Sequence, residues 1–173
     1  VVPGVRLAPT SGTVPVVVRT SRYESELVLA NPGVEPITAD LLLPAAQRSA
    51  QVTLGPKEQK LIPRVVDFIL GGDGSPAAPV VGPLTVSGRT PTRAVSVYAA
   101  ARTTTIGLGG AFGVFTPAIA DGAPTEAWIY GLRNDEEVRS NLAFESSIYV
   151  QAAVELYSGE TGEELATLGP YQL

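Results

Sequence analysis

The chain has 173 residues, a net charge of −5 and no Cys, His or Met. Without Cys and His, the composition excludes disulfides, Ser-His-Asp and Cys-His catalysis, and the usual structural zinc sites. A hydrophobic fraction of 45% is typical of a folded protein, and the 18 Gly and 15 Pro residues favour an all-β fold with many turns.

Short strands separated by turns are predicted along the first hundred residues. The β-branched run Val14–Arg19 carries Pro15 near its start, which is typical of an edge strand or a first strand position. Residues 25–31 alternate, with Leu27 and Leu29 on one face, and Asn31-Pro32-Gly33 has the chemistry of a turn. Further strands are expected at residues 37–43, 50–54, 58–63, 83–87 and 93–104.

Three stretches carry a more specific expectation. Residues 64–70 are either one helical turn or a buried strand, because periodicity cannot distinguish the two over so short a run. The alanines at 99–101 predict close packing with little side-chain volume. The Gly-rich apolar run 106–115 is expected to bend or to pass close to another backbone.

The last third of the chain contains the cleanest alternation. Ile148, Val150, Ala152, Val154 and Leu156 share one face of a predicted strand. Tyr149 and Tyr157 lie on the opposite face, which is expected to meet solvent or a partner. Residues 158–162 predict a hairpin turn into a further strand at 163–168. Upstream, Trp128 and Tyr130 share a face of a predicted strand at 127–133.

The final stretch repeats an earlier one. Residues 138–173 follow the pattern of residues 23–59, and Leu168-Gly169-Pro170 corresponds to Leu54-Gly55-Pro56. We therefore expect a complete first β-sandwich unit at 1–113 and a partial second unit at 114–173. The second unit lacks counterparts of residues 61–104, which a partner strand could supply.

Many short strands, frequent turns and no long helical pattern predict an all-β, antiparallel β-sandwich. The runs L-V-L-A-N-P-G at 27–33 and V-T-L-G-P-K-E at 52–58 resemble the repetitive Ig-like β-sandwich modules of bacterial secreted and cell-surface proteins. The Gly-rich run 109–113, leading to Phe115-Thr116-Pro117, fits the link between tandem copies. The resemblance implies an Ig-like sandwich, a non-catalytic surface role and a secreted or cell-surface location, and it supplies no site residues.

Carboxylates are the remaining candidates for chemistry. Glu24 and Glu26 would share a strand face, but a solvated face lacks the cleft that a glycosidase needs. The acidic runs 135–137 and 160–164, and Asp73 between glycines, do not have the alternating ligands of a Ca²⁺ loop. We expect no enzyme activity, no cofactor and no metal.

Charge is distributed unevenly. Residues 1–120 carry ten basic and seven acidic side chains, whereas residues 121–173 carry two basic and ten acidic ones. The acidic end argues against nucleic acid as a partner, and the longest uncharged run, 103–120, is too irregular for a membrane span. Opposite ends of two copies could attract each other, although acidic surface also serves solubility alone.

These patterns favour a non-enzymatic extracellular structural or adhesive subunit that assembles through strand and protein contacts, as in a filament, a pilus-like fibre or a surface layer. Residues 1–20 are the candidate donor strand. The expected interface residues are Val1, Val2, Val14, Val16, Val18, Tyr149 and Tyr157. The alternative is a carbohydrate- or protein-binding accessory module of a larger secreted protein, in which exposed aromatic rings contact the ligand.

Overall fold

The computed structural model describes residues 10–72, 78–107, 110–120, 142, 144 and 149–173. The chain divides into two compact units, Val1–Ala123 and Pro124–Leu173. The described residues are nearly all β. The strands of the first unit are β1 (Ser11–Arg19), β2 (Tyr23–Ala30), β3 (Ile37–Leu43), β4 (Arg48–Leu54), β5 (Gln59–Ile62), β6 (Val80–Arg89), β7 (Ala94–Val95), β8 (Tyr98–Gly107), β9 (Gly110–Pro117) and β10 (Ile119–Ala120).

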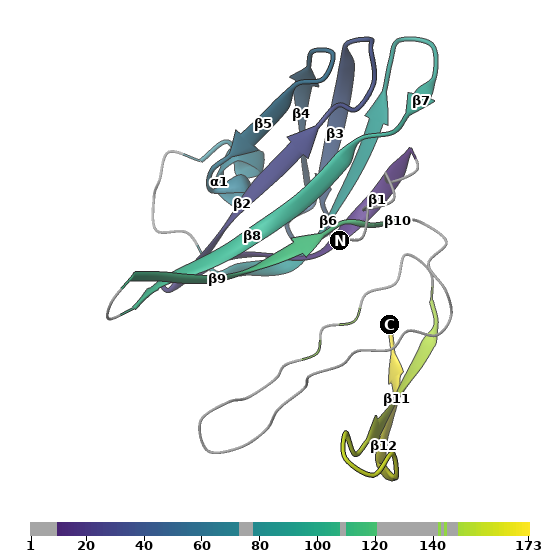
Figure 1. Ribbon diagram of the computed structural model, residues 1–173. Coiled ribbons are helices and arrows are strands. Elements are labelled where there is room, and N and C mark those ends of the chain that lie inside the picture. Colours follow the sequence, from purple (N-terminus) through teal and green to yellow (C-terminus); the bar gives the residue numbers. More distant parts are fainter. Residues whose placement is uncertain (1–9, 73–77, 108–109, 121–141, 143, 145–148) are drawn as a thin grey trace. The chain divides into compact units, whose positions relative to one another are not determined.

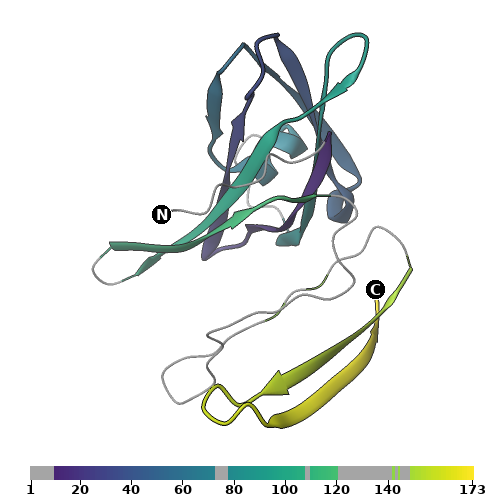
Figure 2. The ribbon, with the colours of Figure 1, turned by 45° about the vertical axis from the view of Figure 1, so that its right-hand side comes forward.

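These ten strands form one large antiparallel sheet, whose main path runs β4-β3-β6-β1-β2-β8-β9. Three strands lie off this path: β10 pairs with β1, β5 with β2, and β7 with β6. The link between β1 and β2 is a single residue pair, Arg19 with Glu24. The sheet therefore turns sharply there, and its two halves lie on either side of the interior in Figures 1 and 2.

One hydrophobic core lies between these halves, and the alternation in the sequence predicts which side chains fill it. Leu27 and Leu29 of β2 are fully buried, as predicted, and so are the alternate residues of β3. The three alanines of β8 at 99–101 are also buried, which confirms close packing at that strand. The core includes Val14, Val17, Leu41, Leu43, Leu54, Val65, Val66, Leu84, Val86 and Val97.

Strand β1 matches neither position that Pro15 suggested, an edge strand or the start of a strand, because β1 begins at Ser11. It pairs with β6 along most of its length and also with β2 and β10, so it lies inside the sheet. The β1–β6 register shifts between Val14 and Val17, which places Pro15 inside a bulge. A bulge accommodates proline because it interrupts the hydrogen-bond ladder in which proline cannot donate.

The two sequence runs that carry the Ig-like resemblance meet in space. The buried Asn31 side chain donates from Nδ2 to the carbonyl oxygens of Glu35 at 2.7 Å and Gly55 at 2.8 Å. Its Oδ1 accepts the Gly33 N–H at 2.8 Å. Its backbone N–H donates to the Glu58 carbonyl at 2.9 Å. Asn31 therefore joins the turn after β2 to the loop between β4 and β5.

Residues 64–70 form a helix, which decides between the two sequence interpretations. Helix α1 (Val65–Leu70) buries Val65, Val66 and Ile69 against the core. A shorter helical turn, η1 (Pro44–Ala46), joins β3 to β4. The single strand predicted at 93–104 is divided into β7 and β8. No helix among the described residues is long and apolar enough to cross a membrane.

The first unit extends further along the chain than the predicted boundary at 113. Strand β9 pairs with β8 over its whole length, from Gly110 opposite Gly107 to Pro117 opposite Ala100. Strand β10 then pairs with β1. Because these hydrogen-bonded ladders belong to the first sheet, the Gly-rich run is not a link, and the division between the units falls after Ala123.

In the second unit, the described strands form the predicted hairpin. Strands β11 (Gln151–Tyr157) and β12 (Glu164–Gln172) are antiparallel, with Val154 opposite Leu168. The rings of Phe144 and Tyr171 stack with their centroids 6.2 Å apart. Trp128, Tyr130 and Ile148, together with the acidic run 135–137, lie outside the described residues.

Candidate functional site

The strongest candidate for a functional surface is the far end of the β8–β9 ribbon, here called the arm: residues 103–107 of β8 and 110–115 of β9. In Figures 1 and 2 the tip of this ribbon runs beyond the neighbouring strands, because β2 pairs with β8 only as far as Thr105. The arm exposes large apolar side chains, with Ile106 at 89%, Phe112 at 58%, Val114 at 59% and Phe115 at 49%. Exposed apolar patches of this kind are common at protein–protein contacts.

One face of the arm continues the core-facing side of the sheet. Ala101, which is buried, lies opposite Leu27, and alternation places Thr103 and Thr105 on the same side. Val114 and Phe112 lie opposite these two threonines. The buried core ends at Ser25, whose Oγ lies 2.6 Å from Oγ1 of Thr103. Beyond this polar pair the same face is apolar but exposed.

The opposite face of the arm is apolar as well. On this face Phe115 lies opposite Arg102, and Gly113 lies opposite Thr104. Ile106 follows Thr104 by two residues, so alternation places its side chain on the same face. Gly113 is required because a Cβ there would lie 2.5 Å from the carbonyl oxygen of Thr103. This close approach confirms one of the two expectations for the Gly-rich run. Both faces of the arm therefore present apolar surface.

The outer edge of β9 also differs from the other long edge of this sheet. Among the described strands, β9 pairs only with β8. At edge strand β4, by contrast, the Lys60 ammonium donates to the Thr53 carbonyl at 2.6 Å. Charged side chains protect sheet edges against added strands, and residues 103–120 contain no charge. Within the residues that the structure describes, the arm thus combines an unprotected strand edge with apolar faces.

The interface residues expected from the sequence are scattered in the structure. Val14 is fully buried, and Val16 and Val18 are half-buried in β1. Strand β1 already pairs with β2, β6 and β10 of the same chain, so residues 11–19 are not available as a donor strand. Tyr149 is 81% exposed and Tyr157 is also exposed, as the alternation predicts. Val1 and Val2 lie outside the described residues.

The candidate catalytic carboxylates of β2 are held in ion pairs. A Glu26 carboxylate oxygen lies 2.8 Å from Nη1 of Arg102, and Glu24 lies 3.7 Å from Nε of Arg64. Arg89 Nε donates a hydrogen bond to the carboxylate of Asp40 on β3 at 2.6 Å, and this hydrogen bond raises the pKa of the Arg89 guanidinium. The part of the chain that the structure describes contains no cluster of three potential metal ligands among its acidic residues.

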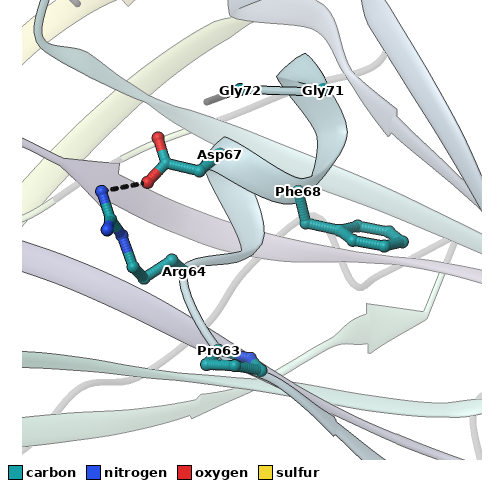
Figure 3. Close-up of a pocket in the computed structure, with 6 residues that line it drawn as sticks. All are labelled: Pro63, Arg64, Asp67, Phe68, Gly71 and Gly72. Carbon is teal, nitrogen blue, oxygen red and sulfur yellow. Dashed lines mark ion pairs between the residues drawn. The ribbon is translucent and has the colours of Figure 1, made fainter. Parts of the chain in front are cut away.

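A hollow of about 390 Å³ lies beside helix α1 (Figure 3). Its polar side chains bind each other: Arg64 Nη2 lies 2.5 Å from Oδ2 of Asp67, and Arg19 Nη1 lies 2.7 Å from Oδ1. Phe68 points away from this pair in Figure 3. Arg64 adopts a left-handed backbone conformation at φ 51°, which costs free energy for a non-glycine residue. The polar side chains beside the hollow are therefore paired with each other, and the two ion pairs of Asp67 form a clamp that holds α1 to β1.

Replacing Asp67 by Asn is expected to lower the free energy of unfolding by about 2 kcal/mol, because two arginines would then face each other without a carboxylate. The measurement is urea unfolding followed by circular dichroism. The matched control is Glu35→Gln, which breaks the exposed Glu35–Arg93 pair at 3.1 Å and should cost less than about 0.5 kcal/mol. Equal losses of unfolding free energy in the two variants would show that the clamp stabilises the fold no more than an exposed ion pair does.

Sequence reasoning did not identify the arm as an interface. The uncharged run 103–120 was visible in the sequence. That β9 would be an edge strand depends on pairing between distant strands, which local alternation does not encode.

Comparison with known proteins adds little to this geometry. No family model and no curated protein matches the chain. The crystal structure of Thermotoga maritima 1070 is similar to 66% of this chain and 96% of its own, with 12% identity and a TM-score of 0.49. That score is too low to support a conclusion about fold or function.

Proposed function

We propose that this protein is a non-enzymatic structural subunit that assembles with further copies of itself through its β-strands. The single observation that supports this best is the arm, where an uncharged strand edge and exposed Phe112 and Val114 coincide. Extended strands bind such edges by main-chain hydrogen bonds, while alternate side chains supply selectivity. Residues 11–19 of the donor segment suggested at 1–20 are already paired in β1, so the proposal places the contact at the arm instead.

The Ig-like resemblance extends the proposal to architecture and location. The sheet halves around one core are compatible with an Ig-like sandwich. Modules of that kind work at the outside of bacterial cells, so we propose a secreted or cell-surface subunit of a filament or surface layer.

Replacing Val114 by Lys is expected to reduce self-association of the full chain at least tenfold. The change places a charge on the edge strand, where it opposes strand addition. The measurement is sedimentation equilibrium over a range of concentrations. The matched control is Leu42→Lys, since Leu42 is 47% exposed but lies on β3, which pairs with both β4 and β6. A wild-type chain that stays monomeric at all concentrations would contradict the assembly function.

The second candidate function is a carbohydrate- or protein-binding accessory module. The observation that favours it is the exposure of Tyr157, on the side of β11 opposite Val154, and of Tyr149, two residues before β11. Exposed aromatic rings can stack on sugars or contact a protein ligand. A monomeric chain that loses glycan binding on Tyr149→Ala would support this alternative instead.

A further inference from the structure

The outer edge of β9 restricts what can bind there. A strand edge presents alternating N–H donors and C=O acceptors, so its occupant has to be another extended strand. We propose that this occupant is strand β9 of a second copy of the chain, running antiparallel, so that one sheet continues from β8 and β9 of one copy into β9 and β8 of the other. This inference rests on the proposed assembly function and names its partner.

Charge favours a second copy at β9 over contacts between other edges. An antiparallel pair of identical strands brings each charge close to its own copy, and like charges opposite each other are destabilising. Strand β9 carries no charge, whereas edge strand β4 carries Arg48 and the hairpin strands carry Glu155 and Glu164. Among the longer edge strands that the structure describes, β9 therefore pairs with itself most favourably.

Side-chain size selects a register for this pair. Every second residue of β9 points its N–H and C=O groups toward the outer edge. These groups meet those of the second copy only if the two residues opposite each other are an even number of positions apart in the sequence. A two-fold axis through Gly113 satisfies this condition and places Phe112 opposite Val114 of the second copy, twice. Aromatic and β-branched residues are favourable cross-strand neighbours. Both residues lie on the apolar face that extends beyond the core, so the contact would bring these side chains of the two copies together on that face.

This geometry has a consequence for assembly. A two-fold contact uses the same surface on both copies and closes after two. The β9 contact alone would therefore give a dimer, and a filament or layer would need a second, different contact. The arm is then the dimerisation element of the proposed subunit.

Disulfide trapping tests the register directly, because the chain contains no Cys and introduced thiols are the sole ones. Two single variants, Phe112→Cys and Val114→Cys, are purified as full chains, one with an affinity tag, then mixed and oxidised. Residues opposite each other in an antiparallel pair have Cα atoms about 4.5–5.5 Å apart, within disulfide range. We expect the mixed disulfide dimer in at least fivefold excess over either homodimer. In each homodimer the cysteines would be roughly 8 Å apart at Cα, which exceeds that range.

The control for random collision is Leu42→Cys, an exposed position on a strand with both edges paired. Circular dichroism checks that each variant is folded. If Val114→Lys abolishes association but the mixed dimer is not enriched, β9 does not pair with a second β9 in the proposed register, and only this inference fails. If the wild type associates and Val114→Lys has no effect, the inference also fails while assembly through another surface stands. A monomeric wild type overturns both.

Discussion

Replacing Asn31 by Ala is expected to lower the free energy of unfolding by about 3 kcal/mol. The side chain is only 2% exposed and makes hydrogen bonds to the backbone at Gly33, Glu35 and Gly55. Alanine would leave these backbone groups without their partner, and a polar group left unsatisfied in a protein interior costs about 1–3 kcal/mol. Urea unfolding followed by circular dichroism measures the loss.

Two further variants separate the hydrogen bonds from the general effect of truncation. Asn31→Asp keeps the acceptor for the Gly33 N–H but loses the donors to two carbonyl oxygens, so it should be as damaging as Ala. Gln51→Ala removes an exposed side-chain hydrogen bond to Asp40 and should cost less than about 0.5 kcal/mol. If Asn31→Asp were neutral, the two carbonyl contacts would not contribute to stability.

Replacing Leu41 by Ala is expected to lower the free energy of unfolding by about 3 kcal/mol. Leu41 is fully buried on β3, between Ala50 of β4 and Val86 of β6. The truncation removes apolar contacts and leaves a cavity that the surrounding strands fill only in part, so both terms reduce stability. Chemical denaturation of the purified full chain gives the difference.

The neighbouring residue provides the matched control. Leu42 belongs to the same strand but points to the other face, where it is exposed. Leu42→Ala removes the same atoms without creating a buried cavity, so it should cost less than about 1 kcal/mol. Similar losses for both variants would mean that the two faces of β3 are not packed differently, which would contradict the position of the core.

Local patterns predicted the strands of the first unit because a strand repeats every two residues. The alternation at Leu27 and Leu29 gave the buried face of β2 directly. The same patterns did not predict how β1 and β9 pair with other strands. Pro15 suggested an edge strand or the start of a strand, yet it lies in a bulge of an interior strand, because the register between distant strands determines where a bulge forms.

The candidate surface was less predictable than the fold. The sequence placed Tyr149 and Tyr157 on an exposed face, and both are exposed. It also suggested Val14 as an interface residue, but Val14 packs in the core, because its side chain lies on the core-facing side of β1. The arm was missed as an interface because its exposure depends on where the core ends, at the pair Ser25–Thr103.

The sequence by itself determined that this protein is built of short antiparallel strands, which faces of those strands are apolar, and where several turns occur. These features depend on residues close together in the chain, through the two-residue period of a strand and the backbone preferences of Gly, Pro and Asn. Only the tertiary structure decided that Asn31 joins two distant loops, that the first unit continues through β10, and that the uncharged β9 ends the main path of the described sheet. The physical reason is that strands pair so that the apolar side chains of the whole sheet become buried. Every strand contributes to that burial, so the pairing of one strand depends on residues far away in the chain.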